Sequence, residues 1–263
     1  MVFKSNINSK KTVKLLALIL TAAISLFAVS ACKTNDEQTL TAVGSGGYRP
    51  FNYINDTGEV IGFDVDVAEE VATRLGMELD YVTAEWSGLV EGLRNEQFDA
   101  IIGSMAITEE RQKTVSFTRP YYYSGAQLVV RKDSGITSPS EMEGLQIGVA
   151  TGSNFAMDAE NLQANVQYYD DDNATAMDLI AGRVDGVITD KIVALEIVSK
   201  IEGGDQLQLC GDLLRTEQMG IAININNEEL LEEVDKIIEE MHRDGTLSEI
   251  SQKWLDGEDI TKE

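Results

Sequence analysis

Cysteine, histidine and proline are scarce in this chain of 263 residues, which contains two Cys, one His and three Pro. If Cys32 carries a lipid, as argued below, Cys210 stands alone and no disulfide within the chain is possible. No group of His, Cys and carboxylate residues has the spacing of a zinc site, so we expect no metal and no cofactor. The single histidine, His242, lies in a charged stretch near the C-terminus, and we expect it on the solvated surface.

Basic residues are also few, with 21 Lys and Arg against 45 Asp and Glu, which gives a formal net charge of −24. The first 31 residues contain four of the lysines and no acid, so the remainder has 17 basic and 45 acidic residues, or −28. A surface of this sign repels phosphate backbones, which argues against nucleic acid as a partner. It suits solubility outside the cell and does not by itself select a ligand.

The first 31 residues have the organisation of a secretory signal peptide. Four lysines precede the uncharged run 15–31, and small residues lead up to Cys32. The run is slightly short for a transmembrane helix, which needs about 20 apolar residues. Its end resembles the bacterial lipobox, in which the cysteine is lipidated and becomes the mature N-terminus. We therefore expect a signal peptide over residues 1–31, followed by a lipidated Cys32 and a short polar tether over residues 32–38.

Strand and helix patterns alternate after the tether, which predicts an α/β fold. The expected strands are 39–44, 77–83, 98–102, 127–130, 146–150, 166–169, 186–189 and 219–224. The expected helices are 63–75, 87–95, 173–181, 228–241 and 247–255, with others beginning at about 108, 154 and 191. Two such series joined by two extended crossings predict two lobes, the first of them completed by the C-terminal segment. The carboxyl ends of the strands, where open α/β sheets bind ligands, can then face each other across a cleft.

An arginine follows the end of one predicted strand. The segment 103–111 leaves the strand at 98–102 and enters a helix capped by Thr108, which places Arg111 in the first turn. The helix dipole disfavours a cation there. Free backbone N–H groups and a guanidinium can, however, grip a carboxylate together. The alternative is that Arg111 pairs with Glu109, with Glu110 or with a neighbouring lobe, and its position alone does not decide between binding and pairing.

A carboxylate follows the end of another predicted strand. Asp190 comes directly after the strand at 186–189 and precedes a helix, so by position it is an ordinary N-cap. It could also accept hydrogen bonds from an ammonium group. Together, Arg111 and Asp190 would match the two charges of a zwitterion.

Aromatic side chains also follow predicted strands. Tyr48 and Trp86 lie where the cleft would be, and their rings could sandwich the side chain of a ligand. Phe51 stands beside a proline, and we expect it to pack in the core.

A series of short motifs resembles the bacterial extracellular solute-binding proteins of family 3, the polar-amino-acid-binding proteins of ABC transporters. The motifs occur in order between about residues 40 and 255, at 47–51, 62–68, 88–89, 98–100, 107–111, 117–122, 181–185 and 220–222. The resemblance implies the two-lobe periplasmic-binding-protein (Venus flytrap) fold with two hinge strands. Lobe 1 would contain residues 39–122 and 220–263, and lobe 2 would contain residues 123–219.

The resemblance also assigns roles to individual residues. Arg111 would hold the α-carboxylate of an amino acid, and Asp190 its α-ammonium. The remaining ligand-binding residues implied are the stacking aromatics Tyr48 and Trp86, the backbone around Ser104, Met105 and Ala106, the loop at Gly152 and Asn154, and Ser45. Basic-amino-acid binders of the family tend to carry an acidic residue where this chain has Ser45, which cannot neutralise a cationic side chain. The expected ligand is therefore an uncharged polar amino acid or cystine.

The function expected from this reading is reversible capture rather than catalysis. The expected partners are a free amino acid, an ABC permease with its ATPase, and the membrane, through lipid on Cys32. We expect a monomer, outside the cytoplasm, at the cell surface or in the periplasm. The enzyme that competes with this reading is a cyclohexadienyl (prephenate or arogenate) dehydratase on the same fold, for which Glu85 is the nearest general acid. A peptidoglycan lyase would need a further catalytic domain after Leu255, and a sensory receptor a separate signalling partner.

Overall fold

The structure, a computed structural model, describes residues 38–262. The expected signal peptide, Cys32 and nearly all of the tether lie outside the described residues. Within the part that is described, no helix combines the length and the apolar character needed to cross a membrane.

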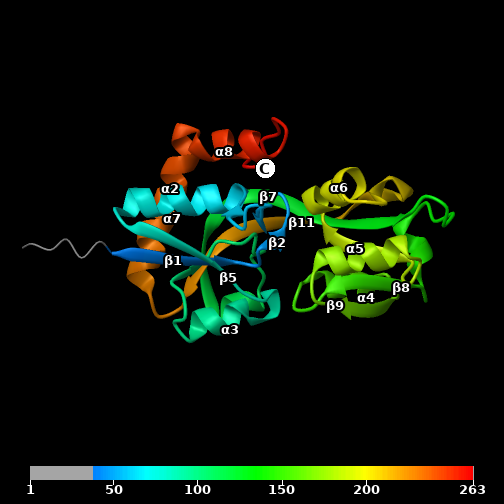
Figure 1. The fold of residues 1–263 in the computed structure, drawn as a ribbon. Coiled ribbons are helices and arrows are strands. Elements are labelled where there is room, and N and C mark those ends of the chain that lie inside the picture. Colours follow the sequence, from blue (N-terminus) through cyan, green and yellow to red (C-terminus); the bar gives the residue numbers. More distant parts are fainter. Residues whose placement is uncertain (1–37, 263) are drawn as a thin grey trace, which may run out of the picture. The chain divides into compact units, whose positions relative to one another are not determined.

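An eight-stranded mixed sheet runs through the described chain in the order β5-β1-β6-β11-β7-β10-β8-β9 (Figure 1). Its strands are β1 (Thr39–Gly44), β5 (Glu78–Thr83), β6 (Ala100–Ile101), β7 (Val115–Arg131), β8 (Gln146–Ala150), β9 (Asn165–Tyr169), β10 (Gly186–Asp190) and β11 (Leu207–Asn224). A small antiparallel sheet contains β2 (Gly47–Tyr48), β3 (Asn52–Ile54) and β4 (Val60–Ile61). The small sheet was not expected from the sequence, because its strands are too short to show an alternating pattern.

Seven α-helices of the described chain cover the large sheet. They are α2 (Phe63–Leu75), α3 (Leu89–Arg94), α4 (Phe155–Asn161), α5 (Asp172–Ile180), α6 (Lys191–Lys200), α7 (Glu228–Asp244) and α8 (Thr246–Trp254). Four single 3₁₀ turns accompany them, η1 (Trp86–Gly88), η2 (Arg111–Lys113), η3 (Pro139–Met142) and η4 (Gly204–Gln206). The C-terminal helices α7 and α8 pack against α2, and α3 covers the opposite face of that part of the sheet (Figure 1).

Two long antiparallel strands join the halves of the sheet. The strand β7 has 17 residues and β11 has 18, and they pair from Val115↔Asn224 to Leu207↔Arg131. At one end β11 pairs with β6, and at the other β7 pairs with β10. These are the two hinge strands of a two-lobe fold, of which the sequence pattern had revealed only the segments 127–130 and 219–224.

Buried hydrophobic residues fill both halves, and one cluster of them extends from α2 to α5 and α6. Near α2, the rings of Phe51 and Tyr122 stack with centroids 4.9 Å apart, and those of Phe63 and Tyr121 with centroids 5.9 Å apart. Phe51 is fully buried, which confirms its predicted place in the core. Around β8 and β10 the core is aliphatic, and its fully buried members include Leu128, Met142, Ile147, Val149 and Ile188.

The structure corrects three sequence predictions. The helix expected from Thr108 is wrong, since only the single turn η2 forms before the chain enters β7 at Val115. The strand expected at 98–102 is reduced to the two residues of β6, because β11 pairs with it only at Ala222 and Ile223. His242 is half-buried rather than solvated, and its Nε2 lies 2.8 Å from the carbonyl oxygen of Pro120.

Candidate ligand-binding site

A cavity of about 120 Å³ lies beside the middle of the hinge strands. The segments that precede β7 contribute Ser45, Gly47, Tyr48, Glu85, Trp86, Ser104, Ala106 and Arg111 to its lining. The segments after β7 contribute Ala150, Ser153, Asn154, Phe155 and Asp170 to Asp172, and the hinge strand β11 contributes Glu217 and Met219. The loops at the carboxyl ends of β1, β5, β6, β8 and β9 thus meet in one place, as the order of strands and helices predicted.

Seven of the residues singled out from the sequence line this cavity, namely Ser45, Tyr48, Trp86, Ser104, Ala106, Arg111 and Asn154. Gly152 lies at the rim, where its carbonyl meets Arg111. The side chain of Met105 instead packs in the core with Leu89 and Val115. Asp190 is fully buried and lies outside the lining.

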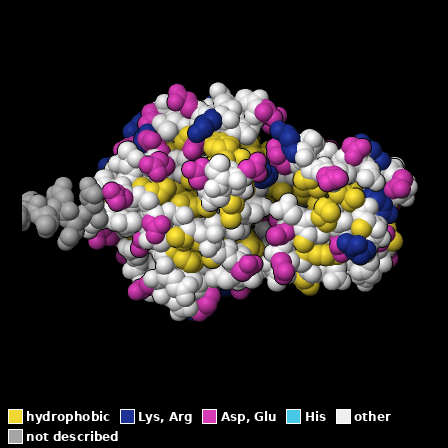
Figure 2. All heavy atoms as spheres, in the orientation of Figure 1, with side chains coloured by type: hydrophobic (Ala, Val, Ile, Leu, Met, Phe, Trp, Pro, Cys, Tyr) yellow, Lys and Arg dark blue, Asp and Glu magenta, His cyan; other side chains and the backbone are white. Residues whose placement is uncertain are grey.

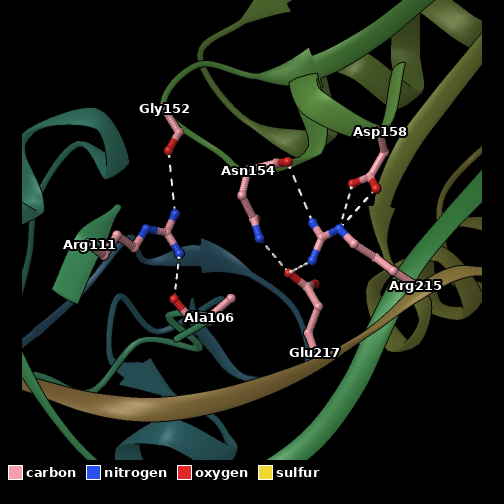
Figure 3. Close-up of polar contacts among 7 residues, drawn as sticks. All are labelled: Ala106, Arg111, Gly152, Asn154, Asp158, Arg215 and Glu217. Atoms are coloured by element: carbon pink, nitrogen blue, oxygen red, sulfur yellow. Dashed lines mark hydrogen bonds and ion pairs between the residues drawn. The ribbon is translucent and has the colours of Figure 1, made fainter. Parts of the chain in front are cut away.

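The guanidinium of Arg111 reaches the cavity from the turn η2. Its Nη1 donates to the carbonyl of Ala106 at 2.9 Å, and its Nη2 donates to the carbonyl of Gly152 at 3.5 Å (Figure 3). It makes no ion pair with any described residue, because Glu110 pairs with Lys113 instead. Burial lowers the pKa of Arg111, and the negative charge of Glu217 opposes this shift. Arg111 therefore does not pair with Glu109 or Glu110, and from the other half of the fold it bonds among the described residues only to the backbone carbonyl of Gly152. A half-buried cation thus faces the cavity without a bonded carboxylate.

The loop after β8 closes over this arginine. Gly152 has φ +78, and a Cβ atom there would lie 3.2 Å from the Cα of Ser87. A side chain at Gly152 would therefore be strained in conformation and crowded by the turn that carries Trp86. On another side, Asn173 of α5 donates from its amide to the carbonyl of Gly47 at 3.3 Å. Both halves of the fold thus touch each other around the cavity.

Asp190 ends β10 and caps α6. Its Oδ1 accepts from the backbone N–H of Ile192 at 2.7 Å, as the N-cap prediction requires. Its Oδ2 is buried and has no hydrogen-bond partner among the described residues. Burial, reinforced by the charge of Glu217, raises the pKa of Asp190 to about 7. Burial and then the charge of Asp190 raise the pKa of Tyr48, whose ring lines the cavity.

Asp64 holds two ligand loops together and was missed in the sequence. Its Oδ2 accepts from Ser104 Oγ at 2.9 Å and from Asn52 Nδ2 at 2.7 Å, and its Oδ1 accepts from the Tyr121 hydroxyl at 2.6 Å. Ser104 has φ +59, a left-handed conformation that is uncommon outside glycine. The available signal was an acidic residue on the buried face of α2, whose position in the first helical turn gave it an ordinary explanation.

A second group missed in the sequence surrounds Arg215 on β11 (Figure 3). Arg215 Nε donates to Asp158 Oδ1 at 2.9 Å, and its Nη1 donates to Glu217 Oε1 at 2.7 Å. Asn154 Nδ2 also donates to Glu217 Oε1, at 2.5 Å. Its members are scattered along the chain, so no local motif reveals the group.

Another carboxylate of the cavity wall was also missed. Asp172, at the start of α5, leaves its Oδ1 buried without a partner among the described residues. Burial raises the pKa of Asp172 to about 6. The described residues contain no group of His, Cys and carboxylates able to hold a metal ion. The site instead combines one unpaired guanidinium, flat aromatic walls and carboxylate oxygens that lack donors, an arrangement suited to a small molecule carrying both charges.

These features define an α/β protein of two lobes whose binding cavity lies between loops of both. The model of the bacterial extracellular solute-binding proteins, family 3, matches residues 40–257, and the chain belongs to this family.

Individual relatives agree with this assignment. The chain is 35% identical to the L-cystine-binding protein TcyJ of Escherichia coli (strain K12), over 88% of this chain and 87% of TcyJ. It is 34% identical to YxeM of Bacillus subtilis (strain 168), a probable amino-acid-binding protein, over 93% of this chain and 96% of YxeM.

Solved structures share the fold. An ancestral arginine-binding protein bound to glutamine matches with a TM-score of 0.78 and 33% identity, over 82% of this chain and 97% of that one. The ancestral amino-acid-binding protein AncCDT-1, a precursor of cyclohexadienyl dehydratase, matches with a TM-score of 0.76 and 28% identity, over 82% and 95%.

Proposed function

We propose that this protein is the lipid-anchored substrate-binding component of an amino-acid ABC importer and captures a free amino acid in the cavity. The observation that carries the proposal is the half-buried guanidinium of Arg111, which faces the cavity without an ion pair among the described residues. A partly desolvated cation without an ionic partner is unfavourable, and the carboxylate of a ligand would pair with it.

The amino acid would be held at both of its charged ends. Arg111 would take the α-carboxylate, helped by the backbone at Ser104, Ala106 and Gly152. The free Oδ2 of Asp190 would take the α-ammonium, with the Tyr48 ring moving aside to admit it. A micromolar dissociation constant corresponds to about 8 kcal/mol. Hydrogen bonds to charged groups contribute about 1.5–3 kcal/mol each. A few such bonds with burial against Tyr48 and Trp86 are sufficient, even after the cost of closing the lobes.

For the ligand we propose an uncharged polar amino acid or cystine. Support comes from Ser45, which lines the cavity and brings no charge to it. The similarity to a protein named for cystine binding points the same way.

Lobe 1 would contain residues 39–122 and 220–263, and lobe 2 residues 123–219. The boundaries follow the middle of the hinge strands, where the pairing of Tyr122 with Met219 comes just before a break in register. The open form would bind the amino acid mainly to lobe 1. Lobe 2 would then add Asp190 and the Gly152 loop as the cleft closes.

Lipid on Cys32 would keep the protein at the membrane, outside the cytoplasm. When the full chain is produced in a bacterium that processes lipoproteins, it should partition with the membrane fraction. The variant Cys32→Ala should lose this anchoring, and a variant that stayed with the membrane as wild type does would contradict it.

A dehydratase is the alternative function, favoured by the structural similarity to AncCDT-1. Glu85 lines the cavity and is the nearest candidate for its general acid. Glu85 is exposed to solvent, whereas catalysis favours a site from which water is excluded. Loss of prephenate absorbance on adding the protein would favour the enzyme over the binding protein.

Thermal unfolding of residues 33–263 against the common amino acids, cystine and prephenate tests the proposal. A ligand at about 100 times its dissociation constant adds about 2.7 kcal/mol of stability, which is several degrees for a chain of this size. A selective shift with one or two free amino acids is the expected result. The protein should first be unfolded and refolded to remove any bound ligand, and a complete lack of shifts after that step would refute the proposal.

A further inference from the structure

Glu217 on the hinge strand β11 lines the cavity and has one carboxylate oxygen without a hydrogen-bond donor among the described residues. The side chain is only 1% exposed and forms part of the cavity lining. Two groups donate hydrogen bonds to this side chain, Arg215 Nη1 and Asn154 Nδ2, and both donate to the same atom, Oε1 (Figure 3). The other oxygen, Oε2, is buried and has no hydrogen-bond partner among the described residues.

The charges around Glu217 do not balance. Arg215 also donates from Nε to both oxygens of Asp158, at 2.9 and 3.0 Å, and the side chain of Asp158 is 5% exposed. The guanidinium of Arg215 therefore pairs with two buried carboxylates, those of Asp158 and Glu217. These three side chains together have one net negative charge. A buried oxygen without a donor is costly, so a donor supplied by a ligand would bind favourably.

We propose that Glu217 Oε2 accepts a hydrogen bond from the side chain of the bound amino acid and thereby sets the specificity of the site. This inference rests on the proposed function, in which Arg111 and Asp190 hold the α-carboxylate and the α-ammonium and leave Glu217 Oε2 free. The site then selects amino acids whose side chain ends in an amide or a hydroxyl, together with cystine, whose second ammonium is the donor.

Two kinds of amino acid are rejected by the same oxygen. An acidic side chain brings a like charge against Glu217. An aliphatic side chain leaves Oε2 buried and unpaired, and a site built to hydrogen-bond a ligand discriminates strongly against an analogue that lacks the group.

The variant Glu217→Gln tests this role with little change in shape. The amide oxygen can still accept from Arg215 and Asn154, so the amide nitrogen takes the place of Oε2 and replaces an acceptor by donors. The matched control is Glu69→Gln, which makes the same chemical change in a solvent-exposed residue of α2 that lies outside the cavity lining. Circular dichroism and thermal unfolding would show that both variants fold.

The first measurement is calorimetry of wild type with L-glutamine against L-glutamate and with L-asparagine against L-aspartate, besides L-cystine. Wild type should prefer the amide of each pair that binds by at least about tenfold, and its tightest ligand should carry a side-chain donor. Glu217→Gln should weaken that ligand at least about tenfold and reduce or reverse the preference for amides. Glu69→Gln should leave both the affinity for that ligand and the preference for amides within about twofold of wild type.

Each other outcome has a definite meaning. If Glu217→Gln folds and binds the tightest wild-type ligand as wild type does, or weakens amides and acids equally, Glu217 does not contact the ligand side chain. A wild-type protein whose tightest ligand is acidic or aliphatic would overturn the inference too. Binding of no amino acid at all would instead reject the proposed function on which it rests.

Discussion

Asp64 and Asp190 are fully buried carboxyl groups, and no described lysine or arginine bonds to either of them. Burial raises the pKa of Asp64 to about 6 and that of Asp190 to about 7. The unfolded value of an aspartate is about 3.9. Between about pH 4 and pH 7 the folded protein therefore holds protons that the unfolded chain has released. The free energy of unfolding must fall as the pH rises through this window and level off above it.

We expect the ligand-free protein to be less stable at pH 8 than at pH 5. The variant Asp190→Asn removes one of these titrations and keeps an oxygen for the Ile192 amide. Between pH 5 and pH 8 its free energy of unfolding should fall by at least about 1 kcal/mol less than that of wild type, because one pKa unit corresponds to about 1.4 kcal/mol. Urea unfolding at the two pH values measures this. A loss of stability as large in the variant as in wild type would contradict the assignment to Asp190.

Arg111→Ala should weaken amino-acid binding by at least about tenfold, the effect of losing one hydrogen bond to a charged group. The fold should tolerate the change, because Arg111 bonds only to two backbone carbonyls and to no carboxylate. Calorimetry on the folded variant measures the affinity. Lys113→Ala is the control, since its partner Glu110 lies at the exposed surface. Equal affinities of Arg111→Ala and wild type would remove Arg111 from the binding site.

Sequence reasoning reached the parts of the site that follow strand ends. Arg111, Tyr48 and Trp86 were identified in this way, and all three line the cavity. Asp172 and Glu217 were missed because their importance depends on which atoms lack partners after folding. No sequence pattern indicates that an oxygen will lack a hydrogen-bond partner after folding. A sequence pattern does indicate where a strand ends.

Each hinge strand was recognised only where its pattern is strongly apolar. The burial of β7 and β11 changes along their length, because each strand serves both lobes, and a mixed pattern hides a strand of 17 or 18 residues. The helix α2 was predicted at its observed limits, because it has a regular buried face and ends at Gly76. The expected helix at Thr108 failed because tertiary pairing draws the chain into β7 after a single turn.

Gly125 lies where the hinge strands approach most closely. A Cβ atom there would lie 2.4 Å from the carbonyl oxygen of Arg215, which belongs to the backbone and cannot swing away. Gly125→Ala should therefore destabilise the protein by about 1–3 kcal/mol. Thermal unfolding measures the change, with Gly88→Ala as the control, since a Cβ at Gly88 meets nothing within 4 Å. A Gly125→Ala variant as stable as the control would show that the strands can separate at no cost.

Acidic side chains are spread over the molecular face shown in Figure 2, in keeping with the net charge of −24. Attraction between the lobes must come from specific contacts around the cavity, because like charges on both lobes repel. The described contacts of this kind include the bond from Arg111 to Gly152 and the bond from Asn173 to Gly47.

Asn173→Ala should weaken binding of the amino acid about two- to tenfold, mainly through faster release, because it removes one neutral hydrogen bond that holds the lobes together. Stopped-flow displacement measures the release rate. Asn165→Ala is the matched control, since the amide of Asn165 donates to the carbonyl of Gly144 within lobe 2. If both variants release the ligand at the wild-type rate, the contact between Asn173 and Gly47 does not hold the cleft closed.

The strand order has a consequence for how the chain folds when its N-terminal residues become available first. The strands β7, β8, β9 and β10 are neighbours in the sheet and arise from the continuous stretch 115–190, so they can assemble as soon as that stretch is available. The strands β5, β1 and β6 come earlier in the chain. Their part of the fold is complete only when the end of β11 and the helices α7 and α8, which come last, are available. The half of the protein that begins first is therefore finished last, and α2 lacks the helices that pack against it until α7 and α8 have formed.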